Sequence, residues 1–225
     1  MITAVLLDLD NTLFNFDKAE AIALKRMLEH FGIEASDEVA GIYHGINDKY
    51  WKMLEKGKVT RGELRVKRFD ELFEQLGIEL LGCEATPIYE GFLGSGHYYM
   101  EHAEELIKLL LPKYDLYLAS NGTSKTQWGR IRSAGLEKIF KGIYISEDMG
   151  INKPAKEYFE YILKDNNLAK EEVVMIGDSL SSDMLGGINA GIRTIWYNPK
   201  GKTSDLLIDY RVSDLLEIPS LLEKM

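Results

Sequence analysis

Two aspartates, Asp8 and Asp10, follow a short apolar run near the start of the chain. The run at residues 5–7 is typical of a strand in a parallel sheet that is covered on both faces. Side chains alternate along an extended segment, so we expect both carboxylates to point to the same side, where open α/β sheets bind ligands. Two carboxylates this close repel each other and need a cation, a shared proton or both. A simple turn rich in Asp and Asn is the alternative.

A hydroxyl, an amide and a glycine stand at the end of a later predicted strand, at Ser120, Asn121 and Gly122. These side chains and the backbone N–H groups beside the glycine suit hydrogen bonds to anionic oxygens. Taken by itself, the segment is better explained as a strand followed by an Asn-Gly turn.

A lysine, Lys153, directly precedes Pro154. The proline favours an extended conformation at Lys153, and a helix that begins at Pro154 would add partial positive charge beside the ammonium group. This arrangement predicts a fixed cation site, with a solvated surface lysine as the ordinary alternative.

Two further aspartates, Asp178 and Asp183, follow the apolar strand predicted at residues 173–177. Asp183 falls at the start of the next predicted helix, where the helix dipole favours an acidic residue, so capping is an alternative role for it. Asp178 has no such alternative, because a carboxylate at a strand end needs a cation.

The predicted site is rich in carboxylates and has no cluster of His or Cys that would favour zinc. Asp8, Asp10 and Asp178 offer the hard oxygen ligands that suit Mg²⁺, which binds through one or two carboxylates plus a substrate phosphate. Ser120, Asn121 and Lys153 would then face the phosphate from the other side. The residue types therefore predict Mg²⁺ as cofactor and a small phosphorylated metabolite as partner.

The elements that position these residues alternate between helix and strand from about residue 97 onward. The periodicity predicts helices at 101–111, 124–134, 154–166 and 181–190, and strands at 114–120, 142–145, 173–177 and 194–197. Such alternation implies a doubly wound parallel sheet, a Rossmann-like α/β fold that the first strand rejoins.

Between the first strand and this region the pattern is helical throughout. Helical spacing covers residues 17–31 and 37–55, and the capping box Thr60-x-x-Glu63 opens a third helix that ends at Gly77. We therefore expect an α/β core of residues 1–15 and 97–225 and a helical insert of residues 16–96. The linkers are expected at residues 14–16 and 91–96, where a hinge could lie.

Composition narrows the class of protein. Of 225 residues 45% are hydrophobic, and the formal net charge of −9 disfavours DNA or RNA as a partner. The single cysteine, Cys83, allows no internal disulfide, which favours the cytoplasm. We expect no signal peptide, and the most apolar helix, around residues 106–111, is too short to cross a membrane. A soluble cytoplasmic protein is expected.

The order Asp-x-Asp-x-Thr, Ser-Asn, Lys-Pro and Gly-Asp-x-x-x-x-Asp resembles the haloacid dehalogenase superfamily, which consists mostly of phosphatases. The resemblance implies that Asp8 is the nucleophile that forms an aspartyl-phosphate and that Asp10 is the general acid and base. It implies Mg²⁺ held by Asp8, the Asp10 main-chain carbonyl and Asp178, with Asp183 in support. The residues implied to bind the phosphoryl group are Thr12, Ser120, Asn121, Gly122 and Lys153.

The helical insert looks like the small cap of this superfamily's first cap class. Segments 46–60, 68–69, 186–191 and 196–199 resemble the pyrimidine 5′-nucleotidase subgroup. This resemblance implies a phosphatase of nucleoside 5′-monophosphates. Sugar phosphates, phosphoglycolate and pyrophosphate are alternative substrates.

Other activities on this fold are less well supported. A 2-haloacid dehalogenase needs no metal and typically lacks the second aspartate, which is present here as Asp10. A non-catalytic binding protein would be expected to have lost Asp8, Asp10 or Lys153. Three aromatic residues of the insert could stack on a base, although helical spacing makes core packing the commoner role. They are Tyr43, Tyr50 and Trp51.

Overall fold

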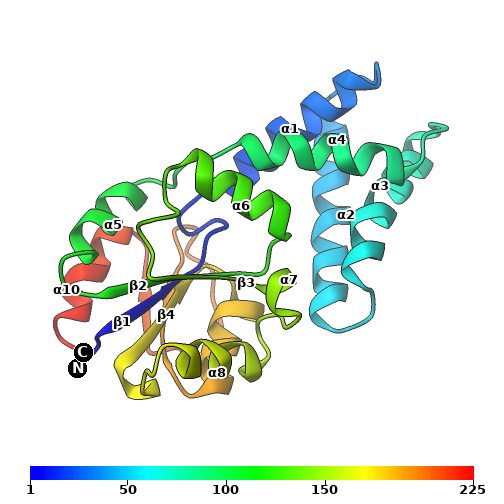
Figure 1. The fold of residues 1–225 in the computed structure, drawn as a ribbon. Coiled ribbons are helices and arrows are strands. Elements are labelled where there is room, and N and C mark those ends of the chain that lie inside the picture. Colours follow the sequence, from blue (N-terminus) through cyan, green and yellow to red (C-terminus); the bar gives the residue numbers. More distant parts are fainter. The chain divides into compact units, whose positions relative to one another are not determined.

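The computed structural model describes all 225 residues, which divide into two compact units (Figure 1). The first consists of Met1–Phe16 and His97–Met225, and we call it the α/β unit. The second consists of Asp17–Gly96, and we call it the helical unit. Neither contains a helix that is both long enough and apolar enough to cross a lipid bilayer.

The α/β unit is built on a six-stranded parallel sheet, which confirms the predicted fold class. In spatial order the strands are β3 (Gly142–Ile145), β2 (Asp115–Ser120), β1 (Ala4–Leu7), β4 (Val173–Gly177), β5 (Arg193–Tyr197) and β6 (Tyr210–Val212). Leu7 lies opposite both Leu118 and Ile176, so β1, β2 and β4 end at the same edge of the sheet. Residues that follow these three strands are therefore brought together.

Helices cover both faces of the sheet (Figure 1). Val5 and Leu7 point into a core shared with α5 (Ala103–Leu110), α6 (Ser124–Ser133) and α10 (Ile218–Leu222). Ala4 and Leu6 point into a second core shared with α8 (Lys156–Asp165). All four residues of β1 are completely buried, as expected for a central parallel strand with an uninterrupted apolar run.

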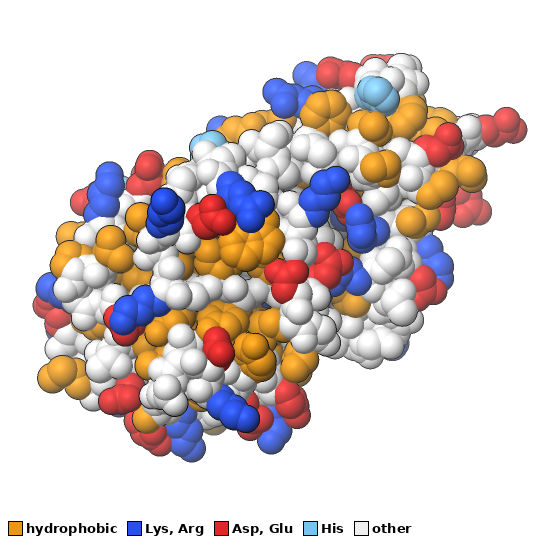
Figure 2. Space-filling view, in the orientation of Figure 1, with side chains coloured by type: hydrophobic (Ala, Val, Ile, Leu, Met, Phe, Trp, Pro, Cys, Tyr) orange, Lys and Arg blue, Asp and Glu red, His pale blue; other side chains and the backbone are white.

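Short helices complete the α/β unit. They are α7 (Ser146–Met149), the 3₁₀ helices Lys170–Glu172 and Leu215–Glu217, the π-helix Leu180–Met184, and α9 (Leu185–Ala190). On the face drawn in Figure 2, basic and acidic side chains are interspersed and the basic ones form no continuous surface.

The helical unit consists of α1 (Phe16–His30), α2 (Asp37–Glu55), α3 (Arg61–Leu76) and α4 (Gly82–Ser95). The predicted capping box at Thr60 is present, with the Glu63 N–H donating to the Thr60 hydroxyl and the Thr60 N–H donating to the Glu63 carboxylate. Aromatic residues fill its core: Tyr43 stacks on Phe69 with ring centroids 5.2 Å apart, and Tyr89 packs against both.

Several boundaries differ from the sequence prediction. Helix α4 was not predicted, and it occupies most of the supposed linker at 91–96, because burial of Ala85, Tyr89 and Leu93 outweighs the cost of an internal proline and glycines. The helix expected at Pro154 begins only at Lys156, and the peptide between Lys153 and Pro154 is cis.

Two elements near the C-terminus, β6 and α10, were not predicted either. Strand β6 has only three residues, of which Tyr210 and Arg211 are exposed, so it carries no continuous apolar pattern. The helix expected from residue 181 is also split, because its first turn is the π-helix and α9 begins at Leu185.

Candidate active site

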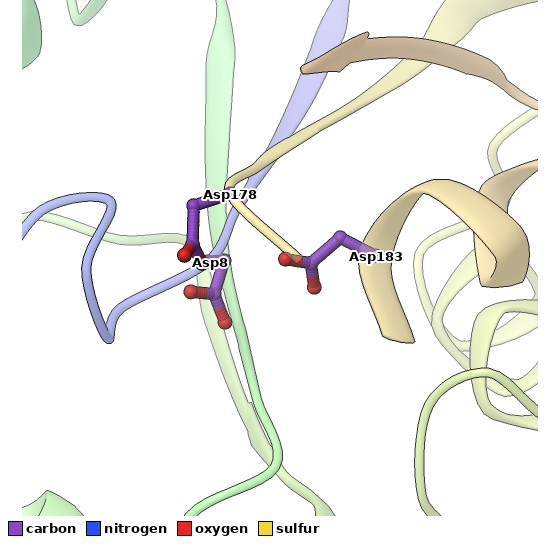
Figure 3. A group of neighbouring side chains, drawn as sticks. All are labelled: Asp8, Asp178 and Asp183. Atoms are coloured by element: carbon purple, nitrogen blue, oxygen red, sulfur yellow. The ribbon is translucent and has the colours of Figure 1, made fainter. Parts of the chain in front are cut away.

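Three carboxylates converge at the edge of the sheet where β1 and β4 end. Asp8 follows β1, Asp178 follows β4, and Asp183 lies in the π-helix and points back toward them (Figure 3). Each offers an oxygen within 4.8 Å of the others. The chain approaches closely here: a Cβ added to Gly177 would overlap the Asp183 carboxylate, so only glycine fits at the end of β4.

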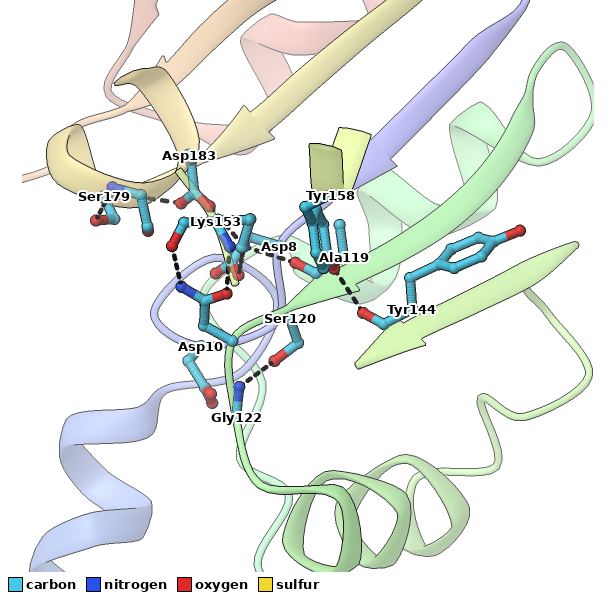
Figure 4. Close-up of polar contacts among 12 residues, drawn as sticks. Asp8, Asp10, Ala119, Ser120, Gly122, Tyr144, Lys153, Tyr158, Ser179 and Asp183 are labelled. Carbon is cyan, nitrogen blue, oxygen red and sulfur yellow. Dashed lines mark hydrogen bonds and ion pairs between the residues drawn. The ribbon is translucent and has the colours of Figure 1, made fainter. Parts of the chain in front are cut away.

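Lys153 is the counter-charge at the centre of this cluster (Figure 4). Its side chain is 1% exposed, and Nζ donates to Asp8 Oδ1 at 2.7 Å, Asp183 Oδ1 at 2.6 Å and the Ala119 carbonyl at 2.7 Å. These bonds use all three ammonium protons. Burial alone would lower the pKa of Lys153, but the carboxylates of Asp183 and Asp8 outweigh it and raise the pKa. The predicted fixed cation is therefore present, and the helix that follows it begins at Lys156 rather than at Pro154.

The carboxylates outnumber the ammonium group, and both burial and this excess of negative charge raise their pKa values. Burial and then Asp183 raise the pKa of Asp178 to about 7. The same two causes raise the pKa of Asp8 well above its ordinary value, against the opposing effect of Lys153. A site of buried carboxylate oxygens with too few positive charges is chemically suited to a divalent cation such as Mg²⁺.

The Asp10 carboxylate is not one of the three that cluster, although its charge helps to raise the pKa values of Asp8 and Asp178. Strand β1 ends at Leu7, so strand alternation does not extend to Asp10, and the chain then turns at Asn11, whose φ is 58°. The Asp10 carboxylate instead binds helix α6, accepting from Arg130 Nη1 at Oδ1 and from Gln127 Nε2 at Oδ2, the latter at 2.7 Å. The third carboxylate of the cluster is that of Asp183, which was expected to support the metal site.

The predicted phosphate-binding residues occupy different positions. The Ser120 hydroxyl accepts from the Gly122 N–H at 3.2 Å. Asn121 uses its amide to hold the main chain of Lys153, donating to its carbonyl at 2.8 Å and accepting from its N–H at 2.9 Å. Thr12 is completely buried, and its hydroxyl has no hydrogen-bond partner.

Sequence reasoning missed Gln127 and Arg130, both of which are buried on α6. They stand three residues apart and lie on the same helix face as Ile131, a core residue. The sequence does contain a signal that could have identified them: two polar side chains on the buried face of a predicted helix.

In the helical unit, Tyr43 is a core residue and is not available to stack on a ligand. Tyr50 and Trp51 are half-buried, and the cationic groups of Lys49 and Arg61 lie over their respective rings.

Comparisons with known proteins agree with this fold. The model of the haloacid dehalogenase-like hydrolase family matches residues 5–197. The HAD-hydrolase YfnB of Bacillus subtilis is 38% identical over 97% of this chain and 94% of its own length. A crystal structure of YfnB bound to magnesium superposes with a TM-score of 0.93, at 37% identity and 98% coverage of both chains.

Two similar proteins are named as pyrimidine 5′-nucleotidases. PynA of Streptococcus pneumoniae is 39% identical over 87% of this chain and 83% of its own length. YjjG of Escherichia coli is 30% identical over 98% of this chain and 97% of its own length. The family model spans the helical unit and most of the α/β unit, and these relatives match nearly the whole chain. The chain therefore belongs to the haloacid dehalogenase-like hydrolases.

Proposed function

We propose that this enzyme is an Mg²⁺-dependent phosphomonoesterase that acts through an aspartyl-phosphate on Asp8. The observation that carries the proposal is the contact between Lys153 and Asp8 within a cluster of three carboxylates, of which Asp8 and Asp183 are buried and Asp178 is half-buried. Lys153 holds Oδ1 of Asp8, which leaves Oδ2 to attack phosphorus. A carboxylate nucleophile divides phosphoryl transfer into two easier steps.

In the first step Asp8 Oδ2 forms a bond to phosphorus while the bond from phosphorus to the leaving oxygen breaks, and Asp10 supplies the proton that this oxygen takes up. In the second step Asp10 removes a proton from a water molecule as the water attacks phosphorus. The bond between Asp8 and phosphorus then breaks and inorganic phosphate leaves.

The remaining residues position the reacting groups and balance their charge. Lys153 keeps Asp8 in place, Asn121 holds the Lys153 main chain, and the end of β2 at Ser120 and Gly122 supports the phosphoryl oxygens. Asp8 and Asp178, with the Asp10 main-chain carbonyl and with Asp183 beside them, would hold Mg²⁺. When bound, Mg²⁺ neutralises charge on the transferring phosphoryl group. Thr12 can contribute only if its buried hydroxyl becomes accessible.

Pyrimidine nucleoside 5′-monophosphates are the proposed substrates. The names of PynA and YjjG support this choice, as does the resemblance of segment 46–60 to the same subgroup. The helical unit would act as the cap that selects the substrate, and the enzyme would work in the cytoplasm. A 2-haloacid dehalogenase is disfavoured by the presence of Asp10.

Phosphate release from a panel of phosphorylated metabolites, with and without Mg²⁺, tests the proposal. The panel should contain dUMP, UMP, AMP, a hexose phosphate, phosphoglycolate and pyrophosphate. We expect turnover only with Mg²⁺, the highest kcat/KM for dUMP or UMP, and inhibition by Ca²⁺, whose looser coordination spoils in-line geometry. Full activity after exhaustive chelation would overturn the metal requirement. A hexose phosphate ahead of every nucleotide would move the function to sugar phosphates.

A further inference from the structure

The Asp10 carboxylate is held at both oxygens by side chains of one helix, α6. Arg130 binds Oδ1 and Gln127 binds Oδ2. The Asp10 side chain is 28% exposed, whereas that of Arg130 is completely buried and Gln127 is 1% exposed. The carboxylate is therefore partly accessible and at the same time fixed to a buried support.

The side-chain amide of Gln127 has only one orientation that satisfies its neighbours. Nε2 donates one proton to Asp10 Oδ2 and one to the Ser120 hydroxyl, both at 2.7 Å, and Oε1 accepts from Arg130 Nη1 at 3.0 Å. A flipped amide would turn its oxygen toward the carboxylate and its NH₂ group toward Arg130, and would lose the bonds to both. A Cβ added to Gly122 would overlap Gln127, so the glycine at this position provides space for the amide.

Arg130 also contacts two aromatic rings that follow Asp10 in the chain. Its guanidinium carbon lies 5.3 Å from the ring centroid of Phe14 and 5.8 Å from that of Phe16. Phe14 is completely buried, and its main chain pairs with that of Asp10. Contacts between the guanidinium and these ring faces restrict the guanidinium before any substrate is present.

We propose that Gln127 and Arg130 are positioning residues that set the location of the Asp10 carboxylate for its two proton transfers. This inference rests on the proposed function. Gln127 bonds to both Asp10 and Ser120, so it also sets the carboxylate relative to the end of β2, where the phosphoryl group is proposed to bind. A general acid must reach its target within hydrogen-bond distance, and a misplacement of about 1 Å can cost about 10²-fold in rate.

Gln127→Met and Arg130→Met remove the donors at similar side-chain length and test the proposal. The leaving group provides a readout that a purely structural role would not give. A nucleoside leaving group needs general acid help, whereas p-nitrophenolate departs without it. We expect kcat/KM to fall by about 10²-fold for the nucleoside monophosphate and to stay within about threefold for p-nitrophenyl phosphate.

A second readout follows from the hydrolytic step. With p-nitrophenyl phosphate, kcat should fall although kcat/KM is retained, and phosphorylated Asp8 should accumulate in rapid-quench experiments. Arg130→Lys retains a charged donor and should recover part of the nucleotide activity. Arg132→Met is the matched control, because Arg132 lies on the same helix, is exposed and contacts Glu137. Its kinetics should equal those of the wild type.

Each other outcome is decisive. Equal loss for both esters without trapped phosphoenzyme would assign the pair to packing alone, and unchanged or increased nucleotide kcat/KM would also overturn the inference. If Arg130→Met does not fold, Gln127→Met and Arg130→Lys decide the question. A wild-type enzyme that hydrolyses neither ester would instead refute the proposed function, and this inference with it.

Discussion

The ammonium group of Lys153 lies 2.7 Å from Asp8 Oδ1, although the two residues are 145 positions apart in the chain. The same nitrogen reaches Asp183 at 2.6 Å. One buried cation thus links a carboxylate at the end of the first strand to another that follows the fourth. Removal of this cation would leave two buried carboxylates without their partner.

Replacement of Lys153 by Met should abolish turnover and destabilise the fold by about 3–5 kcal/mol at neutral pH, because unpaired buried carboxylates are costly. Urea unfolding and steady-state kinetics measure the two effects. Lys156→Met is the control, since Lys156 forms only an exposed pair with Glu160. A stable Lys153→Met protein with normal kcat would show that the ammonium group is dispensable.

Asp8 and Asp10 should respond differently to the same substitution. Asp8→Asn removes the nucleophile, so neither phosphoenzyme nor turnover is expected. Asp10→Asn should still be phosphorylated by p-nitrophenyl phosphate and then stall, because the second step needs a base whatever the leaving group. Turnover of a nucleoside ester should fall by about 10²–10⁴-fold.

Rapid-quench labelling with radioactive phosphate distinguishes the two variants. Asp10→Asn should give a burst of labelled enzyme without steady turnover, whereas Asp8→Asn should give neither. Similar losses for aryl and nucleoside esters, with no trapped phosphoenzyme, would show that Asp10 is not the acid and base.

Metal binding should depend on pH through Asp178, whose pKa is about 7 in the metal-free protein. A protonated carboxyl must lose its proton to bind a cation, so Mg²⁺ affinity should weaken as pH falls below 7, by up to about tenfold per pH unit for one proton. Calorimetric titration with Mg²⁺ between pH 6 and 8 measures this dependence. An affinity that is constant over the range would contradict it.

The raised pKa of Asp178 also affects stability. Between the ordinary aspartate pKa of 3.8 and the raised pKa of about 7, the folded metal-free protein holds a proton that the unfolded chain releases. The unfolded state therefore binds fewer protons, and the free energy of unfolding should fall as pH rises through this window. Urea unfolding of the metal-free protein at pH 5 and pH 7 measures the change, and Asp178→Asn should reduce it.

Gly177→Ala should displace the Asp183 carboxylate, because the new Cβ would overlap it. We expect weaker Mg²⁺ binding and a destabilisation of about 1–3 kcal/mol from overpacking. Gly45→Ala is the matched control, since a Cβ there meets nothing within 4 Å, and this helical change should stabilise by about 0.5–1 kcal/mol. Equal Mg²⁺ affinity in both variants would show that the close approach at Gly177 is not needed.

Trp51→Ala tests whether the helical unit contacts the base of a nucleotide substrate. Trp51 is half-buried, with the guanidinium of Arg61 5.8 Å from its ring centroid, so part of the ring remains accessible. If the ring stacks on the base, kcat/KM should fall more for dUMP than for a small aryl phosphate. Tyr43→Phe is the control, because Tyr43 is completely buried. An equal loss for both substrates would assign Trp51 to packing.

The sequence alone determined the features that depend on neighbouring residues. The apolar run at 5–7 marked a buried central strand, and parallel strands that end at one edge bring Asp8, Ser120 and Asp178 into one region. The capping box at Thr60 and the left-handed glycine at Gly77 are local in the same sense, so their positions could be read from the chain.

Tertiary structure decided the partners of each carboxylate. Strand alternation does not fix the Asp10 side chain because β1 ends at Leu7, and its partner Arg130 lies 120 residues away on a helix whose docking no local pattern specifies. The Asp183 carboxylate lies near Asp8 because Gly177, at the end of β4, has no side chain to occupy that space. Spacing along a chain determines which residues share an element, but the distance between two charges depends on loop paths and packing, which form only in the folded protein.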